Sequence, residues 1–318
     1  ILSKWKYVDE LLNGVSQTQH NNYTVELNLQ TSYKAGQAWI DTRLNFSEKG
    51  GLFKGTANRI NVQRVYIGYH FITHGPAKAD AYVGRRELGI LYDSEIEYDA
   101  RGDGATIRLG YEIPKWADFT VTTGMYSVEP QFVWIIQASI LDMFRIGCFA
   151  KYSYTSWGPG RPPGSKQLID TQYRISQFLI GYQKRPEWLG LPVKAFAAFL
   201  WNHGAERNFL SDNSLQNLGG YVGLQVGATK KKNNFALQGQ LQVVQLQAIP
   251  DWDVSGIGRG NAAKGSLWKA TTLRGVNGNT NYKGWEVALN YSLTDNLIIK
   301  TKFRFLINLI KILLIPIS

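Results

Sequence analysis

The densest group of ionisable side chains is a run of carboxylates in the stretch 88–104. Five acids fall within eleven residues, and they are Asp93, Glu95, Glu97, Asp99 and Asp103. One interpretation is an ordinary solvated surface loop. The other is a loop that lines one side of a water-filled passage, with bases on the opposite side. Such a loop narrows the passage, and the two rows of opposite charge create a transverse electric field that selects ions. Water in such a passage removes most of the desolvation penalty that a dry site imposes on acids.

Bases that could face these carboxylates are scattered singly along the chain rather than gathered in a tail. We expect the following to point into the passage: Arg43, Arg86, Arg108, Arg145, Lys151, Lys300 and Lys302. The formal net charge of +11 gives the passage an excess of positive charge, so it would favour anions. The densest basic run is only Lys230–Lys232, and without a basic stripe we expect no nucleic-acid partner.

Residue types that are typical of catalysis or metal binding lack the necessary spacing. The histidines are His20, His70, His74 and His203, and none has ligand spacing with cysteines or acids. The chain contains no Gly-x-Ser-x-Gly motif. The glycine-rich stretch 256–263 neither follows a buried parallel strand nor opens a helix, so we expect it to be a flexible outer loop. We therefore expect no enzyme, no metal and no cofactor, although a Ser–His pair on the rim of a barrel stays open as an alternative.

The elements that would position these side chains are predicted from a two-residue period. In one example, the apolar residues Ala105, Ile107 and Leu109 alternate with polar or small residues. About fourteen segments share this pattern, and most have the roughly 9–11 residues that a tilted strand needs to cross a bilayer. Strands of soluble proteins average only about 5–6 residues. The segments are 22–32, 38–47, 60–72, 79–88, 104–113, 118–127, 131–140, 144–154, 171–183, 192–202, 218–229, 234–247, 282–292 and 296–305.

The connections between these segments alternate in length. The short ones are 33–37, 114–117, 141–143, 230–233 and 294–296, and the long ones are 47–59, 89–103, 155–170, 203–217 and about 248–281. Short turns on one rim and long loops on the other are typical of transmembrane barrels, so we expect the short turns on the periplasmic rim and the long loops outside. The short connection 128–130 breaks this alternation. Aromatic residues gather at segment ends, as in the girdles at both membrane interfaces. No apolar stretch reaches the 18 or more residues of a membrane-spanning helix.

These patterns predict an all-β fold, a transmembrane antiparallel β-barrel that forms a single domain over residues 1–318. About fourteen strands can be read from the sequence, and about sixteen would complete a barrel that encloses water. Residues 1–15 are ambiguous, because Trp5, Val8 and Leu12 fit helical spacing. Residues 306–318 form an atypical apolar tail, which we interpret as a truncated last strand.

Three stretches carry a resemblance to a known family. They are LPVKAFAAFLWN (191–202), the turn GATKKKNNF (227–235) and KGWEVALNYSLTDNL (283–297). Together they resemble a porin family of bacterial outer-membrane β-barrel proteins over about residues 170–305. The segment YVGRRE (82–87) is also similar to the strand that precedes the inward-folded loop of porins. In the family another loop and a closing strand follow the final turn and strand, whereas this chain runs into the apolar tail.

The residues and the resemblance together predict a porin-like channel for passive diffusion in the outer membrane of a Gram-negative bacterium. We expect small hydrophilic solutes or ions to pass, with anions favoured. Expected partners are outer-membrane lipid and these solutes, with a homotrimer as a candidate assembly. Two alternatives stay open. One is a binding, adhesin or receptor barrel without an open channel that uses the long loop 248–281, and the other is a soluble sandwich of many strands.

Overall fold

The computed structural model describes most of the chain. The described residues are 2–12, 15–50, 59–128, 131–158, 172–207, 213–229, 231–250, 252–258, 280–295 and 297–309. They contain one helix, α1 (Leu88–Leu91), and otherwise consist of strands and their connections. No helix in this part of the chain is long and apolar enough to cross a membrane.

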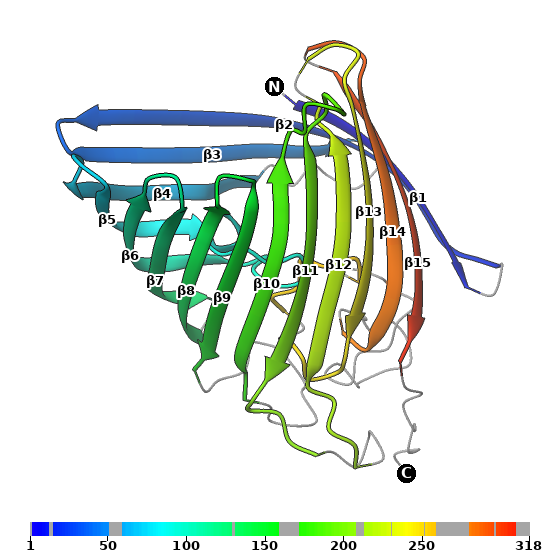
Figure 1. The fold of residues 1–318 in the computed structure, drawn as a ribbon. Coiled ribbons are helices and arrows are strands. Elements are labelled where there is room, and N and C mark those ends of the chain that lie inside the picture. Colours follow the sequence, from blue (N-terminus) through cyan, green and yellow to red (C-terminus); the bar gives the residue numbers. More distant parts are fainter. Residues whose placement is uncertain are drawn as a thin grey trace.

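The strands form one antiparallel sheet of fifteen, in which each strand pairs with its neighbours in the sequence (Figure 1). They are β1 (Leu2–Leu12), β2 (Val15–Ala35), β3 (Ala38–Gly50), β4 (Arg59–Ile72), β5 (Ala77–Glu87), β6 (Arg101–Ile113), β7 (Ala117–Val128), β8 (Gln131–Met143), β9 (Cys148–Trp157), β10 (Arg174–Lys184), β11 (Val193–Asn202), β12 (Leu218–Gly227), β13 (Phe235–Val244), β14 (Tyr282–Ser292) and β15 (Ile298–Asn308). This architecture confirms the predicted all-β antiparallel fold, and β2 to β15 correspond to the predicted segments.

The two ends of the chain differ from their sequence-based interpretation. The ambiguous stretch 1–15 contains strand β1, which pairs with β2 from Leu2 opposite Glu26 to Leu12 opposite Val15. The apparent helical spacing covers too few turns to compete with backbone pairing to an otherwise open sheet edge. At the other end β15 continues to Asn308, so the apolar tail begins as strand. Residues 310–318 of that tail lie outside the described residues.

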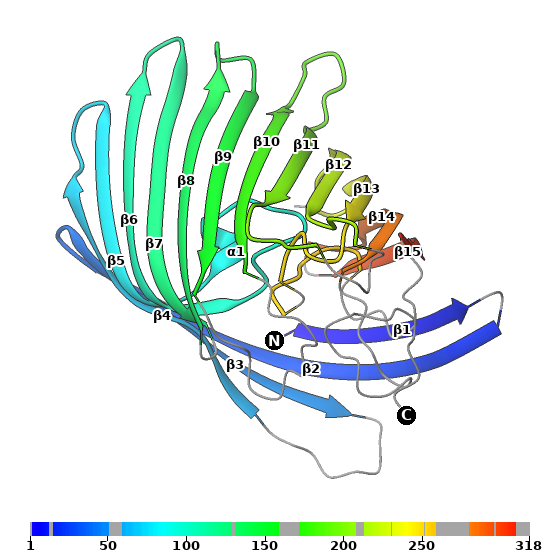
Figure 2. The same ribbon diagram turned by 90° about the horizontal axis from the view of Figure 1, so that it is seen from below.

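The sheet curls around a concave side (Figure 2). Its two edges are β1 and β15, which do not pair with each other among the described residues, so the barrel is not closed here. Connections alternate largely as the sequence predicts: β6–β7 and β8–β9 are joined by short turns at one rim, and the longer β5–β6 and β11–β12 connections lie at the opposite rim (Figure 1). The short β7–β8 connection is the predicted exception at that rim. The helix α1 belongs to the β5–β6 connection and lies inside the curl (Figure 2).

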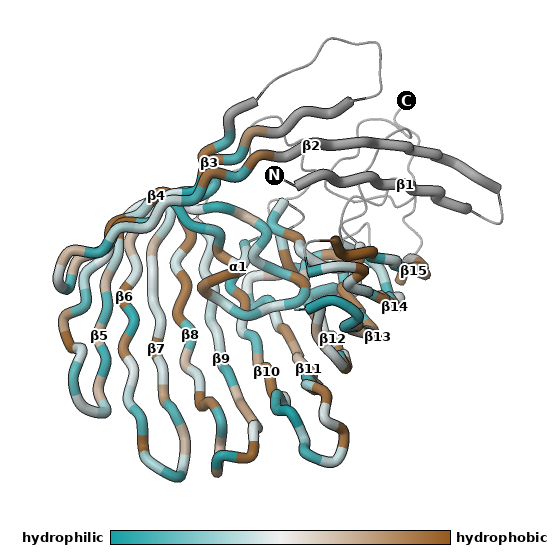
Figure 3. Tube along the Cα trace, turned by 90° about the horizontal axis from the view of Figure 1, so that it is seen from above, coloured by the Kyte–Doolittle hydropathy of each residue, from teal (hydrophilic) through white to brown (hydrophobic). Residues whose placement is uncertain are grey.

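Side chains alternate between the concave side, which we call the inner face, and the convex outer face. In β8, Val133, Ile135 and Gln137 are buried on the inner face, whereas Phe132 and Trp134 are exposed on the outer face. Hydropathy therefore changes along individual strands (Figure 3). A strand with a two-residue period in polarity fits a sheet whose two faces meet different surroundings.

Candidate functional site

The β5–β6 connection folds onto the inner face and carries the acidic residues. We call residues Leu88–Ala100 the inner loop. Three glutamines of the sheet bind its backbone. Gln137 Oε1 accepts a hydrogen bond from Asp93 N at 2.9 Å, Gln177 Nε2 donates to Asp93 O at 2.7 Å, and Gln242 Nε2 donates to Glu95 O at 3.3 Å. These glutamines come from β8, β10 and β13, so the loop crosses much of the inner face.

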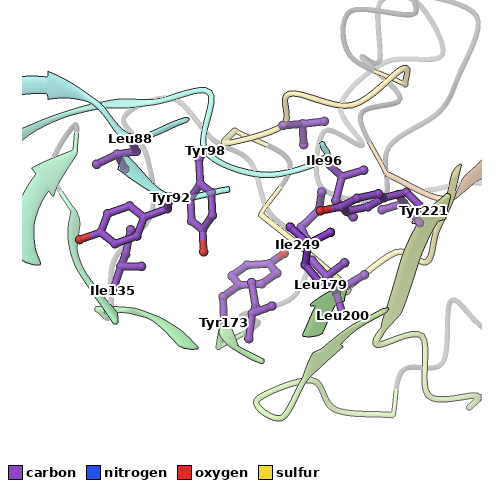
Figure 4. Close-up of a cluster of buried hydrophobic side chains, with 14 of the residues drawn as sticks. Leu88, Tyr92, Ile96, Tyr98, Ile135, Tyr173, Leu179, Leu200, Tyr221 and Ile249 are labelled. Atoms are coloured by element: carbon purple, nitrogen blue, oxygen red, sulfur yellow. The ribbon is translucent and has the colours of Figure 1, made fainter. Parts of the chain in front are cut away.

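Aromatic and aliphatic side chains of the inner loop pack against the inner face of the sheet (Figure 4). The hydroxyl of Tyr92 lies 2.9 Å from that of Tyr126 on β7, and the hydroxyl of Tyr98 lies 2.7 Å from Thr155 Oγ1 on β9. Ile96 is fully buried and lies beside Tyr221 in Figure 4. The buried hydroxyls of both tyrosines of the inner loop thus have a partner, as burial requires. The inner loop is thus a packed part of the molecule and not a solvated surface loop.

Two carboxylates of the inner loop contact lysines of the sheet. Lys151 Nζ on β9 lies 2.5 Å from Asp93 Oδ2, and Lys194 Nζ on β11 lies 3.4 Å from Glu95 Oε1. Lys151 belongs to the predicted set of bases. Lys194 does not, although it is a single base within an apolar strand, which is the signal that could have identified it.

The remaining acids of the predicted row do not face bases in the same way. Glu97 is buried, and neither of its carboxylate oxygens has a hydrogen-bond partner among the described residues. Burial raises the pKa of Glu97 well above its usual range, and the nearby Asp253 raises it further. Asp99 is half-buried. Asp103 lies on β6 and pairs with Arg85 Nη2 at 2.6 Å, on the outer face. The expectation of a fully hydrated acidic row is therefore wrong for Glu97, because the loop packs tightly where it meets a second buried segment.

Predicted bases on β5 and β6 lie on the inner face. The guanidinium of Arg86 lies between two aromatic rings, 4.3 Å from the ring centre of Tyr66 and 4.4 Å from that of Tyr82. Such cation–π contacts fix an arginine in place without neutralising its charge. Arg108 is exposed and lies two residues after Thr106 on β6, so both side chains are on the same face of the strand. The hydroxyl of Thr106 contacts Tyr126 on the inner face. Neither arginine makes an ion pair with another described residue.

Arg43 lies on the same face of β3 as Asp41, two residues earlier. Asp41 is paired in register with Tyr66 and forms an ion pair with Arg64 Nε at 2.5 Å. Arg43 itself stands directly opposite Arg64 in the β3–β4 register. Arg43, Arg86 and Arg108 are thereby brought to one stretch of the inner face, formed by β3 to β6.

The predicted lysines of the last strand occupy the opposite edge of the sheet. Lys300 and Lys302 share a face of β15 with Arg304, a base that the sequence reasoning missed. Lys302 Nζ lies 3.3 Å from Glu286 Oε1, and Arg304 contacts the other oxygen of the same carboxylate. Glu286 is buried on the inner face of β14, so these two bases neutralise it.

Arg145 does not lie on a strand inside the passage, contrary to prediction. It lies in the turn between β8 and β9 with a φ of 58°, because β9 begins only at Cys148 and not at residue 144. Its guanidinium contacts three carboxylates of the short-turn rim: Asp118 at 2.9 Å, Glu112 at 3.4 Å and Asp142 at 3.5 Å. Glu112 and Asp118 stand at the end of the inner face of β6 and β7, so Arg145 lies at the short-turn rim of the inner face, where carboxylates compensate its charge.

A second segment, Gln245–Gly258 without residue 251, also lies on the inner face, and we call it the second inner segment. The sequence predicted 248–281 as an outer loop, which is wrong for its first part because 248–250 and 253–254 are buried against the inner loop. Asp253 Oδ2 accepts a hydrogen bond from Tyr98 N at 3.3 Å, and Asp253 Oδ1 accepts one from Ala100 N at 2.7 Å. Residues 259–279 lie outside the described residues.

Two histidines in the described part of the chain make ordinary polar contacts. His70 Nδ1 lies 2.6 Å from Asp80, and His203 Nε2 lies 2.8 Å from Ser176 Oγ, which also contacts the hydroxyl of Tyr152 at 3.1 Å. The second contact is the kind of Ser–His pair that was left open. A catalytic nucleophile–base pair usually has a third group that orients the base. Among the described residues, no acid bonds to the other ring nitrogen of His203, so such a group is not found for this pair. The described residues also hold no cluster of three or more potential metal ligands.

The fold is similar to that of solved porins. The high-pH structure of OprB from Pseudomonas putida matches with a TM-score of 0.57 and 11% sequence identity, over 91% of this chain and 84% of that chain. The low-pH structure of OprB matches with a TM-score of 0.50 and 12% identity, over 91% and 82%. No protein-family model matches the chain, and no curated protein matches its sequence. The structural likeness to OprB confirms the predicted antiparallel, barrel-type fold of this chain.

Proposed function

We propose that this protein is an outer-membrane channel of a Gram-negative bacterium, through which small hydrophilic solutes diffuse passively. The observation that carries the proposal is the inner loop, which places charged groups on the inner face of a porin-like sheet. The fold likeness to OprB and the sequence resemblance to porins support the same function.

The outer face supports a position in lipid. Large apolar side chains are exposed along its strands, for example Ile107 and Leu109 on β6 and Trp285, Val287 and Leu289 on β14. A continuous apolar surface of this extent favours aggregation of a protein in water. In a bilayer the same surface meets hydrocarbon, and antiparallel strands of about 9–11 residues satisfy their backbone groups by pairing.

The inner face supports a preference for anions. The acids Asp93 and Glu95 are each paired with a lysine, so the inner loop adds little uncompensated negative charge at these positions. Arg43, Arg86 and Arg108 face the same side with no ion pair to another described residue. The resulting excess of positive charge attracts mobile anions in a water-filled passage.

Conductance of the refolded full chain in planar bilayers tests the proposal. We expect stepwise conductance increases, and a reversal potential in a KCl gradient that indicates preference for chloride. Heat-unfolded protein in the same detergent is the control for leakage. Folded protein that inserts without conducting would contradict the channel and favour the binding or receptor barrel.

A further inference from the structure

Two segments that are far apart in the sequence join on the inner face. Glu97 of the inner loop and Val254 of the second inner segment form an isolated antiparallel bridge. Ser255 N donates to Ile96 O at 3.1 Å, and Ser255 Oγ donates to Glu97 O at 2.7 Å. The β5–β6 and β13–β14 connections are thereby fastened to each other by backbone and side-chain hydrogen bonds.

Asp253 completes this junction from the second inner segment. Its carboxylate is fully buried and accepts the backbone N–H groups of Tyr98 and Ala100. Backbone donors of this kind stabilise a carboxylate inside a protein. The side chain of Asp253 thus satisfies free backbone N–H groups of the inner loop, as a capping residue does at the end of a helix.

Glu97 lies at the same junction without comparable partners. It is 1% exposed, and both of its carboxylate oxygens are buried with no hydrogen bond among the described residues. An unpaired carboxylate in a dry environment is very costly, so a buried acid either binds a proton or moves to water. The closed junction therefore requires a neutral Glu97.

The described groups around the pair provide no compensating positive charge. Among the described residues, no lysine or arginine forms an ion pair with Glu97 or Asp253. The titratable groups that act on the pair are Asp99, an additional acid, and Tyr98, whose hydroxyl contacts Thr155 of β9. Aromatic rings close the other side.

These rings belong to three elements. Trp252 packs edge to face against Trp157 of β9, with ring centres 6.1 Å apart, and against Tyr173 before β10, with ring centres 5.4 Å apart. Only one of the three, Tyr173, carries an ionisable hydroxyl. These aromatic contacts place apolar surface beside Asp253, and an environment of low dielectric constant opposes a second negative charge there.

We propose that Glu97 and Asp253 form a proton-dependent latch between the inner loop and the second inner segment, closed while the pair carries at most one negative charge and released at higher pH. The latch is a property of the folded chain. Its consequence for solute flow rests on the proposed channel function, because release would free the inner loop to change the width of the passage.

The direction of the pH dependence follows from the carboxyl groups. Burial raises the pKa of Glu97 well above its usual range and raises that of Asp253 to about 7. A group whose pKa is raised in the closed state stabilises that state fully below its ordinary pKa of about 4. This stabilisation begins to be lost above that ordinary pKa and continues to be lost until the pH passes the raised values, so the latch should weaken from about pH 4 upward and be weakest above neutrality.

Hydrogen exchange of the full chain in detergent micelles tests the latch without requiring conductance. Protection factors, corrected for intrinsic exchange, are compared at pH 5 and pH 8.5 for peptides covering 96–100 and 252–255. We expect protection in both peptides to fall by about tenfold or more at the higher pH, since one pKa unit corresponds to a factor of ten. Peptides from β6 serve as the internal reference.

Substitutions test whether the pH dependence of hydrogen exchange comes from Glu97 and Asp253. Glu97→Gln cannot ionise and should keep protection at pH 8.5, while Asp253→Asn should reduce the pH dependence even if its lost acceptor lowers protection at both pH values. The matched control is Glu95→Gln, which removes a charge from the same loop at a position paired with Lys194. It should leave the pH dependence unchanged.

Three outcomes would overturn the latch. They are equal protection at both pH values in the original chain, an unchanged pH dependence in Glu97→Gln, and protection at pH 5 that EDTA abolishes and calcium restores, which would make the pair a cation site. Conductance separates the two proposals. If hydrogen exchange depends on pH as expected but the protein does not conduct, only the channel proposal is refuted. If the protein conducts but hydrogen exchange does not change with pH, only the latch proposal is refuted.

Discussion

Charged residues of the inner face differ in whether their charge is compensated. Asp93 and Glu95 contact lysines, and Glu286 contacts two bases of β15. Arg86 and Arg108 have no such partner in the described part of the chain. A guanidinium that is held by rings or exposed to water keeps its full attraction for a passing anion.

A matched pair of arginines tests this distinction. Arg108→Gln removes a charge from the inner face and should shift the reversal potential in a KCl gradient toward cations. Arg145→Gln removes the same charge from the short-turn rim and should shift it much less. The shift should shrink between 0.1 M and 1 M salt, because the Debye length falls from about 10 Å to about 3 Å. Equal shifts from both variants would place the selective charges at the rim.

Part of this site can be predicted from the sequence, and the rest cannot, for a physical reason. Alternation of polarity places Arg86, Arg108 and Lys151 on the inner face, because facing depends only on neighbours along the strand. The partners of the inner loop depend instead on contacts between residues far apart in the chain. Nothing near Gln177 or Asp253 in the sequence indicates that each binds the backbone of a loop in the first third of the protein.

At the scale of strands, the two-residue period in polarity predicts that β2 to β15 exist, but it does not predict where each strand begins and ends. The predicted segment 144–154 begins before β9, which starts at Cys148. Positive φ angles at Phe144 and Arg145 mark a turn, and neither residue type signals one from sequence alone. One misplaced boundary was enough to assign Arg145 to a strand when it lies in the turn at the rim.

Facing within a strand gives a stability prediction for β14. Val287→Arg places a charge on the apolar outer face near the middle of the strand, and it should lower the free energy of unfolding in lipid by about 2–4 kcal/mol. Lys300→Leu alters an exposed inner-face residue on the adjacent strand and is the control, with a smaller expected change. Denaturant titration of both variants in vesicles measures the difference. Similar losses would mean that the register of β14 is shifted by one residue, since such a shift exchanges the faces.

At the scale of the whole molecule, two connections fold inward and the sheet curls around them. A core of buried side chains joins the inner loop, the second inner segment and the inner faces of β7 to β14. Arg43, Arg86 and Arg108 lie on β3 to β6, the remaining stretch of the sheet. We therefore expect solutes to pass beside these arginines, while the packed inner segments restrict the rest of the inner face.

The alternation of short and long connections predicts the orientation of the protein in the membrane. Glu206 follows β11 on the long-connection rim, and Lys232 lies in the β12–β13 turn on the opposite rim; both are exposed. In a chain whose half-buried Cys148 is replaced by serine, Glu206→Cys should react with a bulky impermeant maleimide on intact cells. Lys232→Cys should react only after the outer membrane is permeabilised, because short turns of such barrels face the periplasm. A bulky reagent is needed because a small one could diffuse through the passage itself. The reverse labelling pattern would invert the orientation and place the inner loop's rim toward the periplasm.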